Sequence, residues 1–255
     1  SAMGLPLACM IGMDNFYRFL DGARLMDMHF KNASFDHSMP VILAMLSIYY
    51  TNFYNIQSHA IICYGDKLIH FTDYVRQLHM ESLGKKIKLD GSHVNVNTGN
   101  VIFGGSGSDG QHSYFQLLHQ GSYTIPIDFI VDAVVSDDQT DTYSLANCLA
   151  QSESLMVGMH ETDPERLIDG DKPNNVLLVN KLSPQSVGQL VSLYEHKVFV
   201  QSVIYGINAF DQYGVELGKK IAQSLNKVIS ESSRYTGKNP STRALLSKIR
   251  EYKKE

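Results

Sequence analysis

The stretch PIDFIVDAVV, residues 126–135, is short and mostly apolar and follows a proline, as expected of a buried β-strand. Similar runs occur earlier and later in the chain, namely HAIICY at residues 59–64 and NVLLVN at residues 175–180. Segments with helical periodicity separate the three runs, for example residues 143–157. Strands that alternate with helices predict an α/β domain with a largely parallel sheet flanked by helices.

Helices are also predicted outside these strands. Proline follows a capping residue at Ser183-Pro184 and Asn239-Pro240, which is typical of helix starts, and the second of these helices forms a C-terminal helical extension. Further helices are predicted over residues 5–31 with a break at Gly12, about 40–53, 70–79 and 111–120. The turn NTGN at residues 97–100 separates two short β-like runs, 94–96 and 101–103, and therefore predicts a β-hairpin.

The composition excludes several classes of protein. The 255 residues are 44% hydrophobic and 19% charged with a formal net charge of −4, an ordinary globular balance without a basic face for nucleic acid. The densest apolar run, residues 41–50, is too short to span a membrane. Three widely spaced cysteines without a CxxC motif favour a reducing compartment, and we expect a cytoplasmic protein.

A glycine-rich loop offers one alternative function. Residues 105–110 read GSGSDG and satisfy GxGxxG between a strand and a helix, with Asp132 further along, as in NAD-dependent oxidoreductases. The predicted hairpin and the acidic Asp109, which would face a pyrophosphate, favour instead a polar turn that caps the next helix. His112 and His119 lie two helical turns apart, about 10 Å, too far for one metal ion. We therefore expect His119 to be structural and His112 to be the better candidate for chemistry.

Three longer motifs identify a family. They are QLHMESLGK at residues 77–85, GQHS at 110–113 leading to HQG at 119–121, and FDQYGVELGK at 210–219. In this order and spacing they resemble the glucose-6-phosphate isomerase (phosphoglucose isomerase) family, and the third closely matches that family's signature F-D-Q-x-G-V-E-x-x-K. Shorter matches, including SAMGLPLA, GARLMDMHF and YEHKVFVQ, extend the resemblance over essentially the whole chain.

The resemblance implies a domain organisation. Members of the family carry two sugar isomerase (SIS) domains, each a parallel sheet flanked by helices, in a chain about twice as long. We therefore expect residues 1–32 to link to a missing N-terminal half, residues 33–205 to form the second sugar isomerase domain, and residues 206–255 to form a helical tail.

The resemblance also implies an activity, the reversible conversion of glucose 6-phosphate to fructose 6-phosphate through a cis-enediolate, without cofactor or metal. Glu81 would move the proton between C1 and C2. His112 and Lys219 would open the sugar ring, and Gln77 and Gln212 would contact the substrate. Because the family places this histidine in the partner's site, we expect a homodimer with His112 contributed across the interface.

Two features qualify this expectation. Glu81 is predicted just past a helix end beside Met80 and Ser82, where partial desolvation would raise its pKa toward neutrality. The family's Ser/Thr-rich phosphate loop and the arginine that stabilises the enediolate are not found in the 255 residues, so we expect them from sequence before residue 1. The alternatives are an enzyme that also acts on mannose 6-phosphate and a sugar-phosphate-binding module without catalysis.

Overall fold

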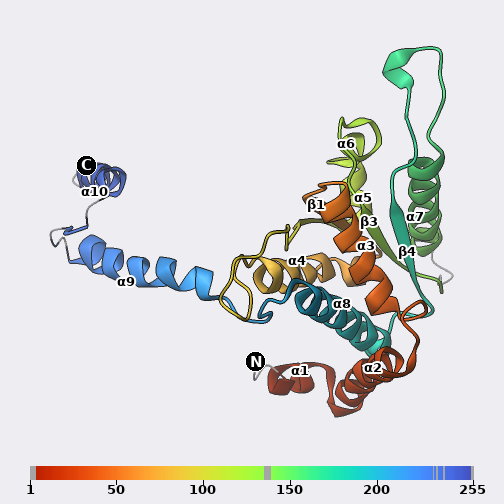
Figure 1. The fold of residues 1–255 in the computed structure, drawn as a ribbon, viewed down its shortest axis with the longest axis horizontal. Helices are drawn as coiled ribbons and strands as arrows, with labels where there is room; N and C mark the ends of the chain where they lie inside the picture. The colour runs from red at the N-terminus through yellow and green to blue at the C-terminus, as the bar shows by residue number, and fades with distance from the viewer. Residues whose placement is uncertain (1–3, 135–138, 232, 234, 238, 254–255) are drawn as a thin grey trace. The chain divides into compact units, whose positions relative to one another are not determined.

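The computed structural model describes residues 4–134, 139–231, 233, 235–237 and 239–253, and it falls into two compact units, Ser1–Phe210 and Asp211–Glu255 (Figure 1). The strands are β1 (Ser58–Tyr64), β2 (Val101–Ser106), β3 (Ile127–Asp132) and β4 (Asn174–Val179). The helices of the first unit are α1 (Gly4–Ile11), α2 (Met13–Asn32), α3 (Met39–Phe53), α4 (Phe71–Leu83), α5 (Gly107–Gln111), α6 (Phe115–Gln120), α7 (Gln139–Val157) and α8 (Pro184–Tyr205). The second unit contains α9 (Glu216–Ser230) and α10 (Pro240–Tyr252).

The four strands form one parallel sheet in the order β2-β1-β3-β4. The chain starts at β1, moves outward to β2, and then crosses back to build β3 and β4 on the other side of β1. Right-handed crossovers in opposite directions place their helices on opposite faces of the sheet, as in doubly wound folds. The predicted parallel sheet with flanking helices is therefore confirmed.

The predicted hairpin over residues 94–103 is wrong. β2 pairs in parallel with β1, with Ser58 opposite Val101, and residues 94–96 form no strand. The NTGN segment is the last part of the connection from α4 to β2, residues 84–100, and it does not turn between two strands. Gly99 fits closely against α4, since a Cβ there would lie 3.3 Å from the backbone carbon of Leu83.

Two hydrophobic layers cover the sheet. One layer lies under α2, α3, α4 and α8, and the other lies under α6 and α7. The most buried residues of the first layer include Ile61, Cys63, Val75, Ile130 and Leu193. Those on the second face include Ile62, Ile127, Phe129, Cys148 and Leu155. The inner strands β1 and β3 are thus buried on both sides, which explains their nearly continuous apolar sequence.

Helix α8 organises the first layer. It starts with a capping box: the Ser183 side chain accepts from the backbone N–H of Ser186, and the Ser186 hydroxyl accepts from the backbone N–H of Ser183. Pro184 occupies the first helical position. It ends at Gly206, whose φ of 68° is the left-handed conformation that favours glycine at this position. The predicted start of this helix is confirmed.

The second unit is small and helical, as predicted for the C-terminus. Asn239 caps α10 by accepting from the backbone N–H of Thr242, and Val228 of α9 and Leu246 of α10 are buried. No helix in the described part of the chain is long and apolar enough to cross a membrane.

Candidate active site

Glu81 and Gln77 lie one turn apart near the end of α4. The helix continues to Leu83, so Glu81 is in its last turn and the prediction that it lies just past a helix end is wrong. The helix was predicted to end near residue 79, but it continues through Ser82 and Leu83, which are buried. Gln77 is exposed and Glu81 is half-buried, which leaves both side chains within reach of a ligand.

The last turn of α4 is held by hydrogen bonds on either side of Glu81. The Lys85 ammonium donates to the carbonyl oxygens of Glu81 (2.8 Å) and Ser82 (3.0 Å), as favours a helix C-terminus. Thr98 donates its hydroxyl to the carbonyl of Lys85 at 2.7 Å. Because residues 97–100 lead directly into β2, Glu81 is fixed at the amino-terminal end of that strand.

His112 lies beyond the other end of β2. The strand runs into α5, a helix of five residues whose first turn is capped by Ser106, which accepts from the backbone N–H of Asp109. His112 closes this helix by donating its own N–H to the Asp109 carbonyl at 3.2 Å, and its ring is exposed. The GxGxxG segment therefore forms the end of β2 and most of α5, with Ser106 as the cap of that helix, and not the separate polar turn that was expected.

The predicted helix over residues 111–120 is interrupted, because α5 ends at Gln111 and α6 begins at Phe115. His119 belongs to α6, and its Nε2 lies 2.8 Å from the side-chain oxygen of Gln151 in α7. This bond joins two packed helices, which agrees with the structural role expected for His119.

Glu81 and His112 are not brought together within this chain. One lies at the amino-terminal end of β2 and the other beyond its carboxyl-terminal end. The six residues of β2 alone separate them by roughly 20 Å of strand.

Gln212 and Lys219 belong to the second unit. Gln212 immediately precedes a short 3-10 turn, Tyr213–Val215, and Lys219 lies in the first turns of α9. Both side chains are exposed within that unit. The signature FDQYGVELGK thus spans a turn and a helix start that display its polar side chains.

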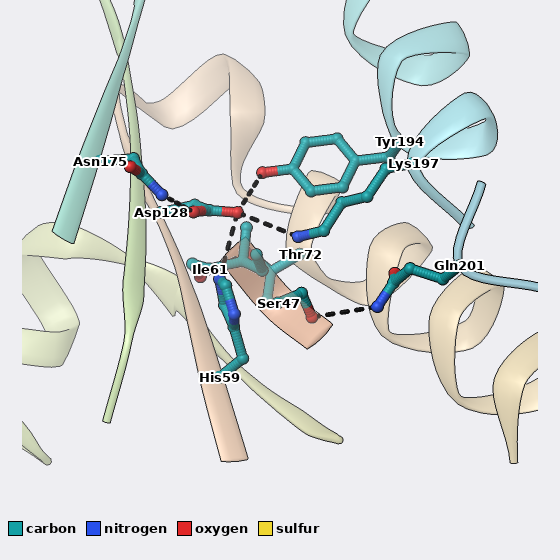
Figure 2. Close-up of polar contacts among 9 residues, drawn as sticks. All are labelled: Ser47, His59, Ile61, Thr72, Asp128, Asn175, Tyr194, Lys197 and Gln201. Carbon is teal, nitrogen blue, oxygen red and sulfur yellow. Dashed lines mark hydrogen bonds and ion pairs between the residues drawn. The ribbon is translucent and has the colours of Figure 1, made fainter. Parts of the chain in front are cut away.

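Sequence reasoning missed the most buried polar cluster, which lies between the sheet and α8 (Figure 2). Asp128 of β3 is fully buried, and its Oδ2 is 3.1 Å from His59 Nε2 and 3.5 Å from Lys197 Nζ. Tyr194 donates its hydroxyl to the same oxygen at 3.1 Å, and Asn175 donates its amide to Oδ1 at 2.9 Å. The sequence signal for this cluster is Asp128 itself, a carboxylate in the middle of an apolar strand, because a buried charge needs partners.

The cluster sets the charge state of its members. Burial acts to raise the pKa of Asp128, but His59 and Lys197 outweigh it and hold that pKa well below its usual range. Burial, together with Lys197 and His59, lowers the pKa of His79 on α4 well below its ordinary value. His79 is therefore neutral, and its Nε2 accepts from the backbone N–H of Asn100 at 3.4 Å.

The comparisons with known proteins agree with these features. The family model described as phosphoglucose isomerase matches residues 1–246. Glucose-6-phosphate isomerases of Pseudomonas fluorescens (strain Pf0-1) and Pseudomonas syringae pv. tomato are 45% identical over 271 aligned residues, which include 98% of this chain and 49% of each relative. The chain thus spans about half the length of these relatives.

Solved structures give the same result. A crystal structure of a glucose-6-phosphate isomerase from Chlamydia trachomatis matches with a TM-score of 0.85 and 33% identity, over 97% of this chain and 48% of that one. A hypothetical protein of Thermus thermophilus, TT0462, shares the fold with a TM-score of 0.65 at 23% identity. The family match includes the glycine-rich loop, which removes the reason to assign that loop to a dinucleotide. The chain belongs to the phosphoglucose isomerase family.

Proposed function

We propose that the full-length protein containing this chain reversibly converts glucose 6-phosphate to fructose 6-phosphate through a cis-enediolate, as a cytoplasmic enzyme of glycolysis and gluconeogenesis. The observation that carries the proposal is the family match over residues 1–246, a range that contains all three motifs and the five proposed site residues. The relatives' names supply the reaction.

Glu81 is proposed as the base that moves the proton between C1 and C2. A single carboxylate can take a proton from one carbon and return it to the next, provided that its position relative to both is fixed. Hydrogen bonds from Lys85 to the last turn of α4 support such a position. Gln77, one turn earlier on the same helix, is proposed to orient the substrate through its amide.

His112 and Lys219 are proposed to open the sugar ring, and Gln212 to contact the substrate. The placement of Glu81 and His112 supports a homodimer in which each active site takes Glu81 from one subunit and His112 from the other. The separation of these two residues along β2 favours this arrangement over a site within one subunit. The phosphate anchor and the cation near the enediolate are proposed to come from the part of the protein outside these 255 residues.

The direct test of the function is the fate of the C2 hydrogen in the full-length protein. With glucose 6-phosphate deuterated at C2, the Glu81→Gln variant is expected to lose both isomerisation and exchange of deuterium into water by at least about a hundredfold. Binding of a sugar phosphate, measured by calorimetry, is expected to stay within about threefold because the amide keeps the size of the carboxylate.

The matched control is Glu153→Gln, which removes an exposed carboxylate of α7 and should leave turnover unchanged. Near-normal turnover in Glu81→Gln would overturn the assignment of the base. Absence of isomerase activity in the unmodified full-length protein would overturn the proposed function itself.

A further inference from the structure

The direction of the His112 ring depends on α5. In the described part of the chain no hydrogen bond holds the imidazole, and the residue is anchored only through its backbone N–H at the end of this helix. A helix of five residues is far too short to be stable by itself, so tertiary contacts must hold it. Whatever fixes α5 therefore also fixes the backbone position from which the imidazole projects.

Tyr64, the last residue of β1, packs directly against α5. Its side chain is 2% exposed and its ring lies directly under Gly107, where a Cβ would come within 2.4 Å of the ring carbon Cζ. Only glycine allows the helix to approach this closely. The Tyr64 hydroxyl accepts a hydrogen bond from the side-chain amide of Gln111 at 3.0 Å, and Gln111 is the neighbour of His112 in sequence.

A second tyrosine contacts the same helix differently. The ring of Tyr114 lies under Gly110, where a Cβ would be 2.5 Å from the phenolic oxygen. That oxygen is buried without a hydrogen-bond partner among the residues that the structure describes. Both rings support α5 by packing, but only the Tyr64 hydroxyl ties it to the sheet by a hydrogen bond.

We propose that Tyr64 is a positioning residue that aims the His112 imidazole, through Gln111 and α5, at the sugar ring bound in the active site. The proposal rests on the ring-opening role proposed for His112. Burial raises the pKa of Tyr64 to about 12, so the phenol stays neutral over the physiological pH range. The contact with Gln111 is therefore present whatever the protonation state of His112.

Ring opening can be measured without isomerisation. In the full-length Glu81→Gln background proton transfer is blocked, and the exchange between the α and β anomers of glucose 6-phosphate, followed by NMR, reports ring opening alone. Tyr64→Phe keeps the ring under Gly107 and removes only the hydroxyl. We expect it to slow anomer exchange about tenfold, because a catalytic group displaced by a fraction of an ångström loses much of its effect.

Tyr114→Phe is the matched control. It removes a buried phenolic oxygen beside the same helix, but one without a partner, so exchange should stay within about twofold of the background. Gln111→Leu should reproduce the Tyr64→Phe defect, and the double variant should be no slower than either single variant. Thermal melting of Tyr64→Phe should not differ from that of Tyr114→Phe by more than a few degrees.

The outcomes separate this inference from the function on which it rests. His112→Ala in the same background should slow exchange by about a hundredfold or more. If it does not, the proposed role of His112 is wrong, whatever Tyr64 does. If His112→Ala has this effect but Tyr64→Phe behaves like Tyr114→Phe, the role of His112 stands and the positioning role of Tyr64 is wrong.

Discussion

Glu81 and His112 lie at opposite ends of the same strand, β2: Glu81 is in the last turn of α4, which precedes the strand, and His112 is the C-cap of α5, which follows it. Ligands of open α/β sheets usually bind beyond the carboxyl ends of the strands, where His112 lies. The proposed base departs from this rule. Two chains related by a twofold axis can resolve the conflict, because the carboxyl-terminal edge of one sheet can then face the amino-terminal edge of the other.

A mixing experiment tests this arrangement. Neither full-length Glu81→Gln nor full-length His112→Ala is expected to be active. If the two residues of a site come from different subunits, a mixed dimer has one site with both changes and one intact site. Random exchange of equal amounts makes half of the dimers mixed, so about a quarter of the unmodified activity should return.

The controls for this experiment use the same proteins. Each variant mixed with itself should stay inactive, and subunit exchange can be verified by native mass spectrometry with one variant isotopically labelled. If verified exchange restores no activity, Glu81 and His112 act within one subunit and the shared site is wrong.

Local sequence patterns predicted most of the first unit. The runs at 59–64, 126–135 and 175–180 correspond to β1, β3 and β4 because burial on both faces of a strand demands a continuous apolar run. The hairpin prediction failed at NTGN because turn chemistry is local, whereas the pairing of β2 with β1 depends on residues more than forty positions apart. No local signal distinguishes a turn from the entry to a parallel strand.

The site was predicted for a different reason. Glu81, His112 and Lys219 were proposed from family motifs, since a glutamate near a helix end is ordinarily a solvated surface residue. The partners of Asp128 could not be predicted, because Lys197 lies 69 residues away in sequence and meets it only when α8 packs on the sheet. Physical pattern recognition predicts that a buried charge needs a partner but does not identify it.

The buried cluster around Asp128 should be costly to break. In Asp128→Asn the Lys197 ammonium, 1% exposed, loses its carboxylate, and we expect a loss of roughly 3–5 kcal/mol in the free energy of unfolding. The measurement is urea denaturation of the full-length protein. Glu251→Gln, which breaks the exposed pair with Lys248, is the control and should change stability little.

A second change sharpens this prediction. Adding Lys197→Met to Asp128→Asn removes the unpaired charge and should recover part of the loss, because the main cost is an uncompensated buried cation. If the double variant is less stable than Asp128→Asn alone by a further similar amount, Lys197 contributes through packing and not through its charge.

His79 should make stability depend on pH near neutrality. Its pKa is lowered well below the ordinary value of about 6.5, so below that pH the unfolded chain binds a proton that the folded chain does not. Stability from this group is therefore complete above pH 6.5 and is lost as the pH falls, by up to about 1.4 kcal/mol per pH unit. In His79→Gln, which keeps an acceptor for Asn100, melting temperatures between pH 7 and 5 should fall less steeply than in the unmodified protein. Equal slopes would show that His79 does not carry this dependence.

The crossing of α2 and α8 depends on a glycine from each helix. A Cβ on Gly22 would lie 1.8 Å from the carbonyl oxygen of Gln185, and one on Gly188 would lie 2.0 Å from that of Phe19. Because backbone atoms cannot move aside as a side chain can, Gly22→Ala and Gly188→Ala should each destabilise the fold by about 1–3 kcal/mol despite the better helix propensity of alanine. Both changes push the same two helices apart, so the double variant should lose less than the sum of the two. Lys31→Ala, at an exposed position of α2, is the control in thermal melting and should have little effect. A gain in stability from either glycine variant would mean that the helices do not approach each other this closely.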